Sequence, residues 1–239
     1  METAIKAFGL LPWTDWAAML VLFFGWSGYA TFAKRRGSVR PSVLATTNRI
    51  RRQWMLQATY REVRVVDGVV IQNLSTSPSF FASTTILVIG GLLAVLGTTE
   101  KASELVREIP FAARTSVLVF DLKVILLLVI FIYAFFRFTW SMRQYTFGAL
   151  LVASMPEAEQ FAARGAEGEA LRQTLADKAG KVVAMAAETF NDGLRAYYFA
   201  FAAVAWFFSP LAFALATAGV IWVLYQREFR SEVLEVLNA

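Results

Sequence analysis

The 239-residue sequence contains no cysteine and no histidine, and each absence excludes a class of chemistry. Without cysteine the chain can supply no disulfide, thiolate nucleophile, zinc–sulfur site or iron–sulfur cluster. Without histidine it has no imidazole base, no Ser-His-Asp triad and no histidine-ligated haem or copper. Any catalysis would have to rest on other side chains. We therefore expect no cofactor, no metal site and no catalytic site, and predict that the protein is not an enzyme.

Charged residues are also scarce, and apolar residues replace them. Only 17% of the residues are charged and 57% are hydrophobic, whereas a soluble domain has about 25% and roughly 45–50%. The apolar excess is concentrated in four long blocks. The composition predicts an all-α, polytopic membrane protein with four transmembrane helices, additional cytoplasmic amphipathic helices and a single membrane domain over residues 1–239.

Four segments supply the approximately 20 apolar residues that a transmembrane helix needs. The predicted spans cover residues 14–33, 78–97, 116–140 and 196–226. Ser77 and Pro78 fit an N-cap and first helical position at the start of the second span, and Pro210 predicts a kink within the fourth. No small-residue cleavage site follows the first span, so we expect a retained helix and not a cleaved signal peptide.

Basic residues predict the orientation of these spans. Sixteen of the 23 Lys and Arg residues fall in the connections after the first and third spans, and seven fall elsewhere. By the positive-inside rule, both connections are cytoplasmic and both termini are periplasmic. The same rule explains the basic charge without nucleic acid, which we do not expect as a partner. The residues expected to contact anionic lipid headgroups are Lys34, Arg35, Arg36, Arg49 and Arg51.

Helical patterns continue into both cytoplasmic connections, over residues 42–66 and 144–194. In the first, Ser42 can cap a helix that mixes arginines with apolar residues, as in helices that lie at a membrane interface. In the second, residues 147–155 are too few to span and suit an interfacial helix. An apolar face over residues 171–190 predicts packing on the first connection. Docking to a partner protein is the alternative.

Two features inside the spans concern packing and charge. Small residues on one face of the second span predict close approach to another helix; they are Ser79, Ser83, Gly90, Ala94 and Gly97. Alternatively, this face, with Ser83, Thr84 and Thr85, lines a pore. Asp15 is expected to be an N-cap, and Asp121, Lys123 and Arg137 lie near span ends. No charge occupies a span centre, which disfavours a proton relay.

Several motifs resemble a known family. They are NRIRRQWM over residues 48–55, DG at 67–68, QNLSTSPSFFASTTILVIGGLLAVLG over 72–97 and FNDGLRAYYFAFAAVAWFFSP over 190–210. Together they resemble the uncharacterised bacterial membrane-protein family catalogued as domain of unknown function 599. The resemblance implies a four-helix protein of the bacterial inner membrane and implies no activity. From the motifs we expect a cytoplasmic polar cluster, a structural clasp in preference to a ligand site, formed by Arg52, Trp54, Asn73, Asn191, Asp192 and Arg195.

The favoured hypothesis is a non-enzymatic structural or accessory subunit of a membrane complex, or a homo-oligomer. Its expected partners are the lipid bilayer, anionic lipids, and other membrane subunits or itself. The alternative is a homo-oligomeric ion channel or small-solute transporter. A third hypothesis is an enzyme acting on lipid, in which Asp67, Asp192 and nearby arginines handle a phosphate headgroup.

Overall fold

The computed structural model describes residues 11–37, 40–108 and 116–238, and these residues form helices and contain no strand. The all-α prediction is confirmed. In chain order the helices are α2 (Trp13–Gly37), α3 (Val43–Tyr60), α4 (Val65–Gly97), α5 (Thr99–Glu108), α6 (Val117–Ala153), α7 (Ala158–Ala162), α8 (Gly165–Val204), the 3₁₀ turn η1 (Ala205–Phe207), α9 (Pro210–Phe229) and α10 (Glu232–Asn238).

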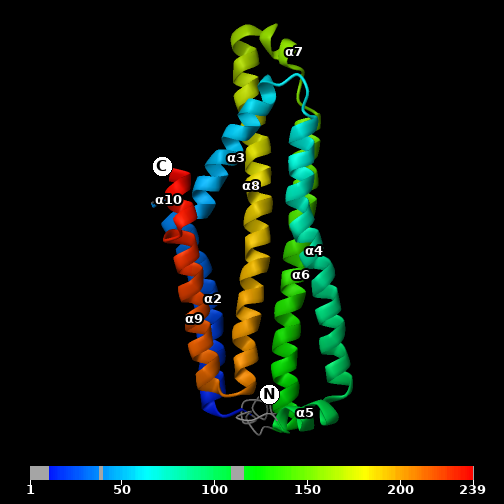
Figure 1. Ribbon diagram of the computed structural model, residues 1–239, viewed down its shortest axis with the longest axis vertical. Helices are drawn as coiled ribbons and strands as arrows, with labels where there is room; N and C mark the ends of the chain where they lie inside the picture. Colours follow the sequence, from blue (N-terminus) through cyan, green and yellow to red (C-terminus); the bar gives the residue numbers. More distant parts are fainter. Residues whose placement is uncertain (1–10, 38–39, 109–115, 239) are drawn as a thin grey trace, which may run out of the picture.

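Three helices are much longer than a bilayer requires. α4, α6 and α8 have 33, 37 and 40 residues, which correspond to about 50–60 Å against a hydrocarbon core of about 30 Å. α2 and α9 flank only the lower part of this trio, whereas α3 and α7 pack on its upper part (Figure 1). We call the lower part the bundle and the upper part, made of α3, α7 and the adjoining halves of α4, α6 and α8, the stalk.

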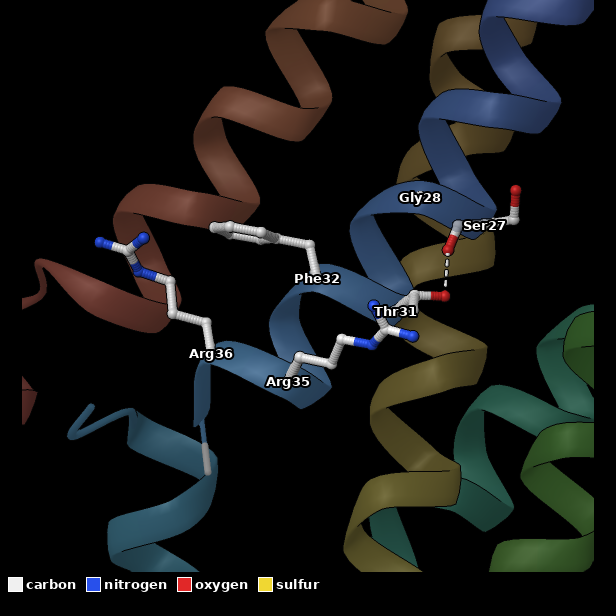
Figure 2. A pocket seen from close by; sticks show the side chains of 6 residues that line it. All are labelled: Ser27, Gly28, Thr31, Phe32, Arg35 and Arg36. Carbon is white, nitrogen blue, oxygen red and sulfur yellow. Dashed lines mark hydrogen bonds between the residues drawn. The ribbon is translucent and has the colours of Figure 1, made fainter. Parts of the chain in front are cut away.

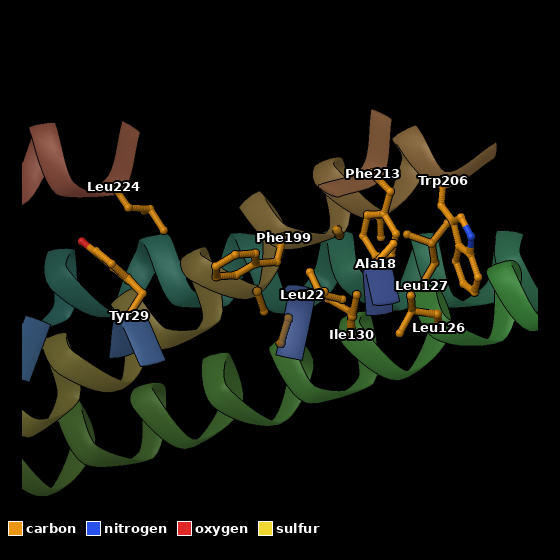
Figure 3. Packing of buried hydrophobic residues seen from close by; sticks show 14 of the residues in the cluster. Ala18, Leu22, Tyr29, Leu126, Leu127, Ile130, Phe199, Trp206, Phe213 and Leu224 are labelled. Carbon is orange, nitrogen blue, oxygen red and sulfur yellow. The ribbon is translucent and has the colours of Figure 1, made fainter. Parts of the chain in front are cut away.

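Each part has its own apolar core. The bundle core joins α2, α4, α6, α8, η1 and α9 and includes the buried side chains of Leu22, Ile130, Phe199, Trp206 and Phe213 (Figure 3). The stalk core is separate and alanine-rich, and it contains Met55, Ile71, Tyr145, Val152, Met155, Ala176, Ala179, Val183 and Ala186. The small residues of α8 let α3 and α6 approach it closely, so the stalk is built from tight helix contacts.

Among the residues that the structure describes, three helices, α2, α4 and α6, are long and apolar enough to cross a membrane. The second and third extend beyond the predicted spans. α4 begins at Val65, and Pro78 lies inside it and not at its first turn, because the uncharged residues before Pro78 continue the helix. α6 begins at Val117, one residue after the predicted start, and the hydroxyl of its N-cap Ser116 accepts from the Val119 N–H. It continues to Ala153, so residues 147–155 mainly extend α6 and do not form a separate interfacial helix.

The predicted fourth span over residues 196–226 is wrong as a single kinked helix. α8 ends at Val204, η1 follows, and α9 begins at Pro210 and runs back beside α2 and α8 (Figure 1). Proline at the first helical position loses no hydrogen bond, and the Ser209 hydroxyl caps the helix by accepting from the Ala212 N–H at 3.0 Å. The uncharged run is a helical hairpin. The prediction of two periplasmic termini assumed that residues 196–226 cross the membrane once. A hairpin over these residues does not support that assumption.

Buried polar groups fix the turn of this hairpin. The Trp206 indole N–H donates to Oδ1 of Asp15 at 2.5 Å, and Nζ of Lys123 donates to the Trp206 carbonyl at 2.8 Å. Asp15 is therefore a partner of the hairpin and not the simple N-cap that the sequence suggested. Asp121 serves the same end of the bundle, since it accepts from the Thr99 hydroxyl at 2.8 Å.

The prediction that residues 171–190 pack on the first connection is confirmed. α3 crosses α8 (Figure 1), and a Cβ added at Gly180 would lie 3.0 Å from the Arg52 Cα. Farther along, Arg172 is buried and donates to the carbonyls of Thr59 and Ala158 at 2.6 and 3.0 Å. Its guanidinium therefore ties α3 and α7 to α8.

Candidate functional site

A polar cleft of about 860 Å³ lies where α2 ends, between α3, α8 and α9. We call it the interfacial cleft. Its charged side chains come from all four helices, and cations outnumber acids among them. The cations are Lys34, Arg35, Arg49, Arg52 and Arg195, and the acids are Glu188, Asp192 and Glu228.

The three acids hold the helices together. Asp192 pairs with Arg137 of α6 and, at 2.9 Å, with Arg195. Glu188 accepts from the Asn48 amide at 2.9 Å. Glu228 of α9 accepts from the Leu44 backbone N–H at 3.1 Å, which joins α9 to the start of α3. Of the five cleft cations, only Arg195 is therefore paired with one of these carboxylates.

Three other cations of the cleft, Lys34, Arg49 and Arg52, are exposed and have few partners or none among the described residues. Lys34 and Arg52 are exposed and form no hydrogen bond or ion pair within the described ranges. Arg49 reaches the Asn238 amide oxygen only at 3.5 Å. Because the acids are already engaged, the cleft presents an excess of positive charge and favours an anion.

The structure divides the predicted polar cluster. Arg52, Asp192 and Arg195 line the interfacial cleft, and Asn191 lines an adjoining pocket of about 250 Å³ on the far side of Arg195. Asn73 is exposed on α4 and lines neither cavity. Four of the six predicted residues therefore lie at the cleft or the adjoining pocket. The other two, Trp54 and Asn73, belong to the stalk.

Trp54 forms a second site in the stalk. Its indole N–H donates to Oδ1 of Asp67 at 2.6 Å, and Arg61 pairs with the same carboxylate. Asp67 is fully buried, so this arrangement is a clasp between α3 and α4. A buried carboxylate with these partners is not open to a lipid headgroup, which removes Asp67 from the lipid-enzyme hypothesis.

The five predicted headgroup residues have different environments. Lys34, Arg35 and Arg49 are exposed at the cleft. Arg36 lies over the rings of Phe32, Tyr225 and Phe229 at 5.4–5.9 Å. Arg51 points inward and donates to Thr47 and Asn48 at 3.0 and 2.8 Å, and burial lowers the pKa of its guanidinium. Arg51 is therefore half-buried, and its guanidinium bonds to side chains of its own helix α3.

The small-residue stripe of α4 packs on no helix of this chain within the described part. Ser83, Gly90, Ala94 and Gly97 are exposed, Ser79 is half-buried, and no atom lies within 4 Å of a Cβ added at Gly90 or Gly97. The buried face of α4 contains Pro78, Ala82 and Thr85 instead. The predicted contact with another helix is therefore not made within the described part of the chain, where α4 packs on α6 by its other face, and contact with a helix of another chain stays a prediction.

The alternative polar face on α4 does not form a continuous open surface. Thr85 is fully buried and lies 2.7 Å from the Tyr197 hydroxyl. The Thr84 hydroxyl donates to the Phe80 carbonyl at 2.9 Å. Of the three residues in this motif, only Ser83 is exposed. The polar groups therefore stabilise α4 and its contact with α8.

Two surface depressions on α2 were not anticipated from the sequence. The first, which we call the outer depression, has a volume of about 640 Å³ and is lined by Ser27, Gly28, Thr31, Phe32, Arg35 and Arg36 (Figure 2). The second is an apolar groove of about 500 Å³ between α2 and α9. Glycine and aromatic residues alternate before the basic end of α2, and this pattern could have indicated a groove on that face. The groove forms only because α9 lies beside that face, which the sequence did not predict.

Comparison with known proteins gives one match. The family model described as "Protein of unknown function, DUF599" matches residues 17–233. No curated protein and no solved structure matches. The family match covers the bundle, the stalk and the hairpin.

Proposed function

We propose that this chain, which belongs to the DUF599 family of unknown function, is a non-enzymatic subunit of the bacterial inner membrane that acts through assembly. It associates with a second copy of itself or with other membrane subunits. The exposed small-residue face of α4 is the contact, and the stalk projects into the cytoplasm.

The topology that best accommodates the helices has five crossings. They are α2, the bundle halves of α4, α6 and α8, and α9, whose 20 residues correspond to about 30 Å. The start of α2 is then periplasmic and α10 is cytoplasmic. Eighteen of the 23 Lys and Arg residues fall on the cytoplasmic side: nine from Lys34 to Arg64, seven from Arg137 to Arg195, and Arg227 and Arg230. This bias is stronger than in the four-span arrangement and supports the orientation.

The observation that carries the assembly proposal is the open face around Gly90. Gly90, Gly91 and Gly97 each have no atom within 4 Å of an added Cβ, and Leu87 beside them is 76% exposed. In lipid, small residues at helical spacing allow another backbone to approach closely, and such faces promote helix association. α4 packs on α6 by its opposite side, so this face is available to another chain.

The test is extraction into native-membrane nanodiscs, followed by sizing and mass spectrometry of the wild type and two variants. Gly90→Leu places a bulky side chain on the proposed contact. Gly219→Leu does the same at an exposed glycine of α9 that also has open space around it. We expect an assembly for the wild type and Gly219→Leu, and a folded monomer for Gly90→Leu whose helical content equals that of the wild type.

Other outcomes decide against the proposal. A monomeric wild type without stoichiometric partners would remove the assembly role, and equal assembly of both variants would remove α4 as the contact. A symmetric homo-oligomer that conducts ions in liposomes would favour the channel or transporter alternative. These measurements separate the subunit from its rival because only the rival requires conduction.

A further inference from the structure

The three cavities around α2 form one continuous surface. The interfacial cleft and the outer depression share Thr31 and Arg35, and the outer depression and the apolar groove share Gly28 and Phe32. The surface therefore changes from polar and cationic at the end of α2 to apolar one to two turns earlier in the helix. That gradient runs along α2.

From this continuity we propose that α2 binds one anionic phospholipid of the cytoplasmic leaflet. Its phosphodiester lies at Arg35 and Arg52, and one acyl chain lies across Gly28 in the groove between α2 and α9. The site goes beyond assembly through α4, since it lies on a different face and involves different helices.

The cationic end fits a phosphodiester. Arg35 lines both the cleft and the outer depression, and its side chain runs back along α2 toward Thr31 (Figure 2). Arg52 approaches from α3 and has no hydrogen bond or ion pair in the described part of the chain, while Lys34 adds a third positive charge. Guanidinium groups bind phosphate oxygens through two parallel N–H donors, so this pair can hold a phosphate with geometric specificity.

The apolar end fits a hydrocarbon chain. No atom lies within 4 Å of a Cβ added at Gly28, whereas one at Gly25 would lie 2.9 Å from the Ile221 side chain. Gly25 therefore lies at the bottom of the groove, where α2 contacts α9, and the absence of a side chain at Gly28 leaves the groove open. Exposed aromatic side chains flank that space: Phe24 is 72% exposed and Trp222 is 63% exposed.

The position along α2 favours a lipid over a soluble phosphate. Arg35 lies 22 residues after Trp13, about 33 Å along the helix, so the arginine is at headgroup depth when Trp13 is at the outer interface. The groove then lies below it, in hydrocarbon. A free phosphate would use the cationic end alone and leave the groove to bulk lipid.

The test is native mass spectrometry of the full chain from nanodiscs that contain equal amounts of phosphatidylglycerol and phosphatidylcholine. We expect one retained phosphatidylglycerol. The Arg35→Gln, Arg52→Gln double variant should lower retention by about tenfold or more, because each interfacial cation adds to the attraction for anionic lipid. Arg143→Gln, at an exposed arginine of α6 outside the cleft, should retain phosphatidylglycerol like the wild type.

A second set of variants tests the contribution of the acyl chain separately from that of the phosphate. Gly28→Leu fills the groove and should lower phosphatidylglycerol retention by about fivefold or more, whereas Gly219→Leu should leave it unchanged. Inorganic phosphate should raise the unfolding midpoint less than phosphatidylglycerol does. Equal retention of both lipids, equal loss in Arg143→Gln, no effect of Gly28→Leu, or an equal shift with inorganic phosphate would each overturn the proposal.

Discussion

The indole N–H of Trp206 donates to the Asp15 carboxylate at 2.5 Å, and both side chains are buried. The two residues are 191 positions apart in the sequence. Their contact joins the start of α2 to the turn between α8 and α9. It fixes the turn of the hairpin against the start of α2.

Loss of this contact should destabilise the bundle. Trp206→Phe keeps most of the buried ring but leaves the Asp15 carboxylate without its indole donor, at a cost of about 1–3 kcal/mol. The unfolding midpoint in detergent should fall accordingly. The double variant Asp15→Asn, Trp206→Phe removes the unpaired charge and should recover part of that loss. A midpoint unchanged by Trp206→Phe would show that the hydrogen bond does not stabilise the turn.

Two helical glycines should respond to alanine with opposite signs. A Cβ added at Gly193 would lie 2.4 Å from the Phe138 ring, whereas one at Gly91 meets nothing within 4 Å. Gly193→Ala should destabilise the protein by about 1–3 kcal/mol through overpacking. Gly91→Ala should be neutral or stabilising by up to about 1 kcal/mol, because alanine favours the helix. Equal midpoints for the two variants would contradict the close approach of α6 and α8.

Arg172 should stabilise the packing of α7 and the end of α3 on α8. Its guanidinium lies 4.2 Å from the Tyr60 ring centre and 4.5 Å from that of Phe161, and it donates to two backbone carbonyls. Arg172→Met keeps the apolar stem and loses those donors. Hydrogen exchange at α7 and at the end of α3 should become faster, while exchange in α9 stays unchanged. Lys178→Met, at an exposed position of α8, is the matched control and should leave exchange at α7 unchanged.

Hydropathy and charge predicted the helices better than their connections. The apolar runs located α2 and the apolar parts of α4 and α6, and Ser42 caps α3 as expected. Composition could not separate one kinked helix from a hairpin around Pro210, because proline suits both positions and the choice depends on the buried Asp15–Trp206 contact. That contact is visible only in three dimensions.

Only part of the candidate site could be predicted from the sequence, because the rest depends on how α9 packs. Arg52, Asp192 and Arg195 stood out in the motifs and line the interfacial cleft. Glu228 comes from α9, which the sequence placed in a single span, so its bond to the Leu44 N–H could not be predicted. The small-residue spacing on α4 was correct as a pattern, but spacing alone does not say whether a face meets the same chain, lipid or another protein.

The most direct test of the five-crossing account uses the absence of native cysteine. Phe208→Cys lies in the turn between α8 and α9, where Phe208 is 43% exposed, and Glu235→Cys lies on the exposed side of α10. A membrane-impermeant maleimide is added to intact bacterial cells with a permeabilised outer membrane, and then to lysed cells. The account predicts labelling of Phe208→Cys before lysis and of Glu235→Cys only after it. Labelling of Glu235→Cys before lysis, or of Phe208→Cys only after it, would contradict the account.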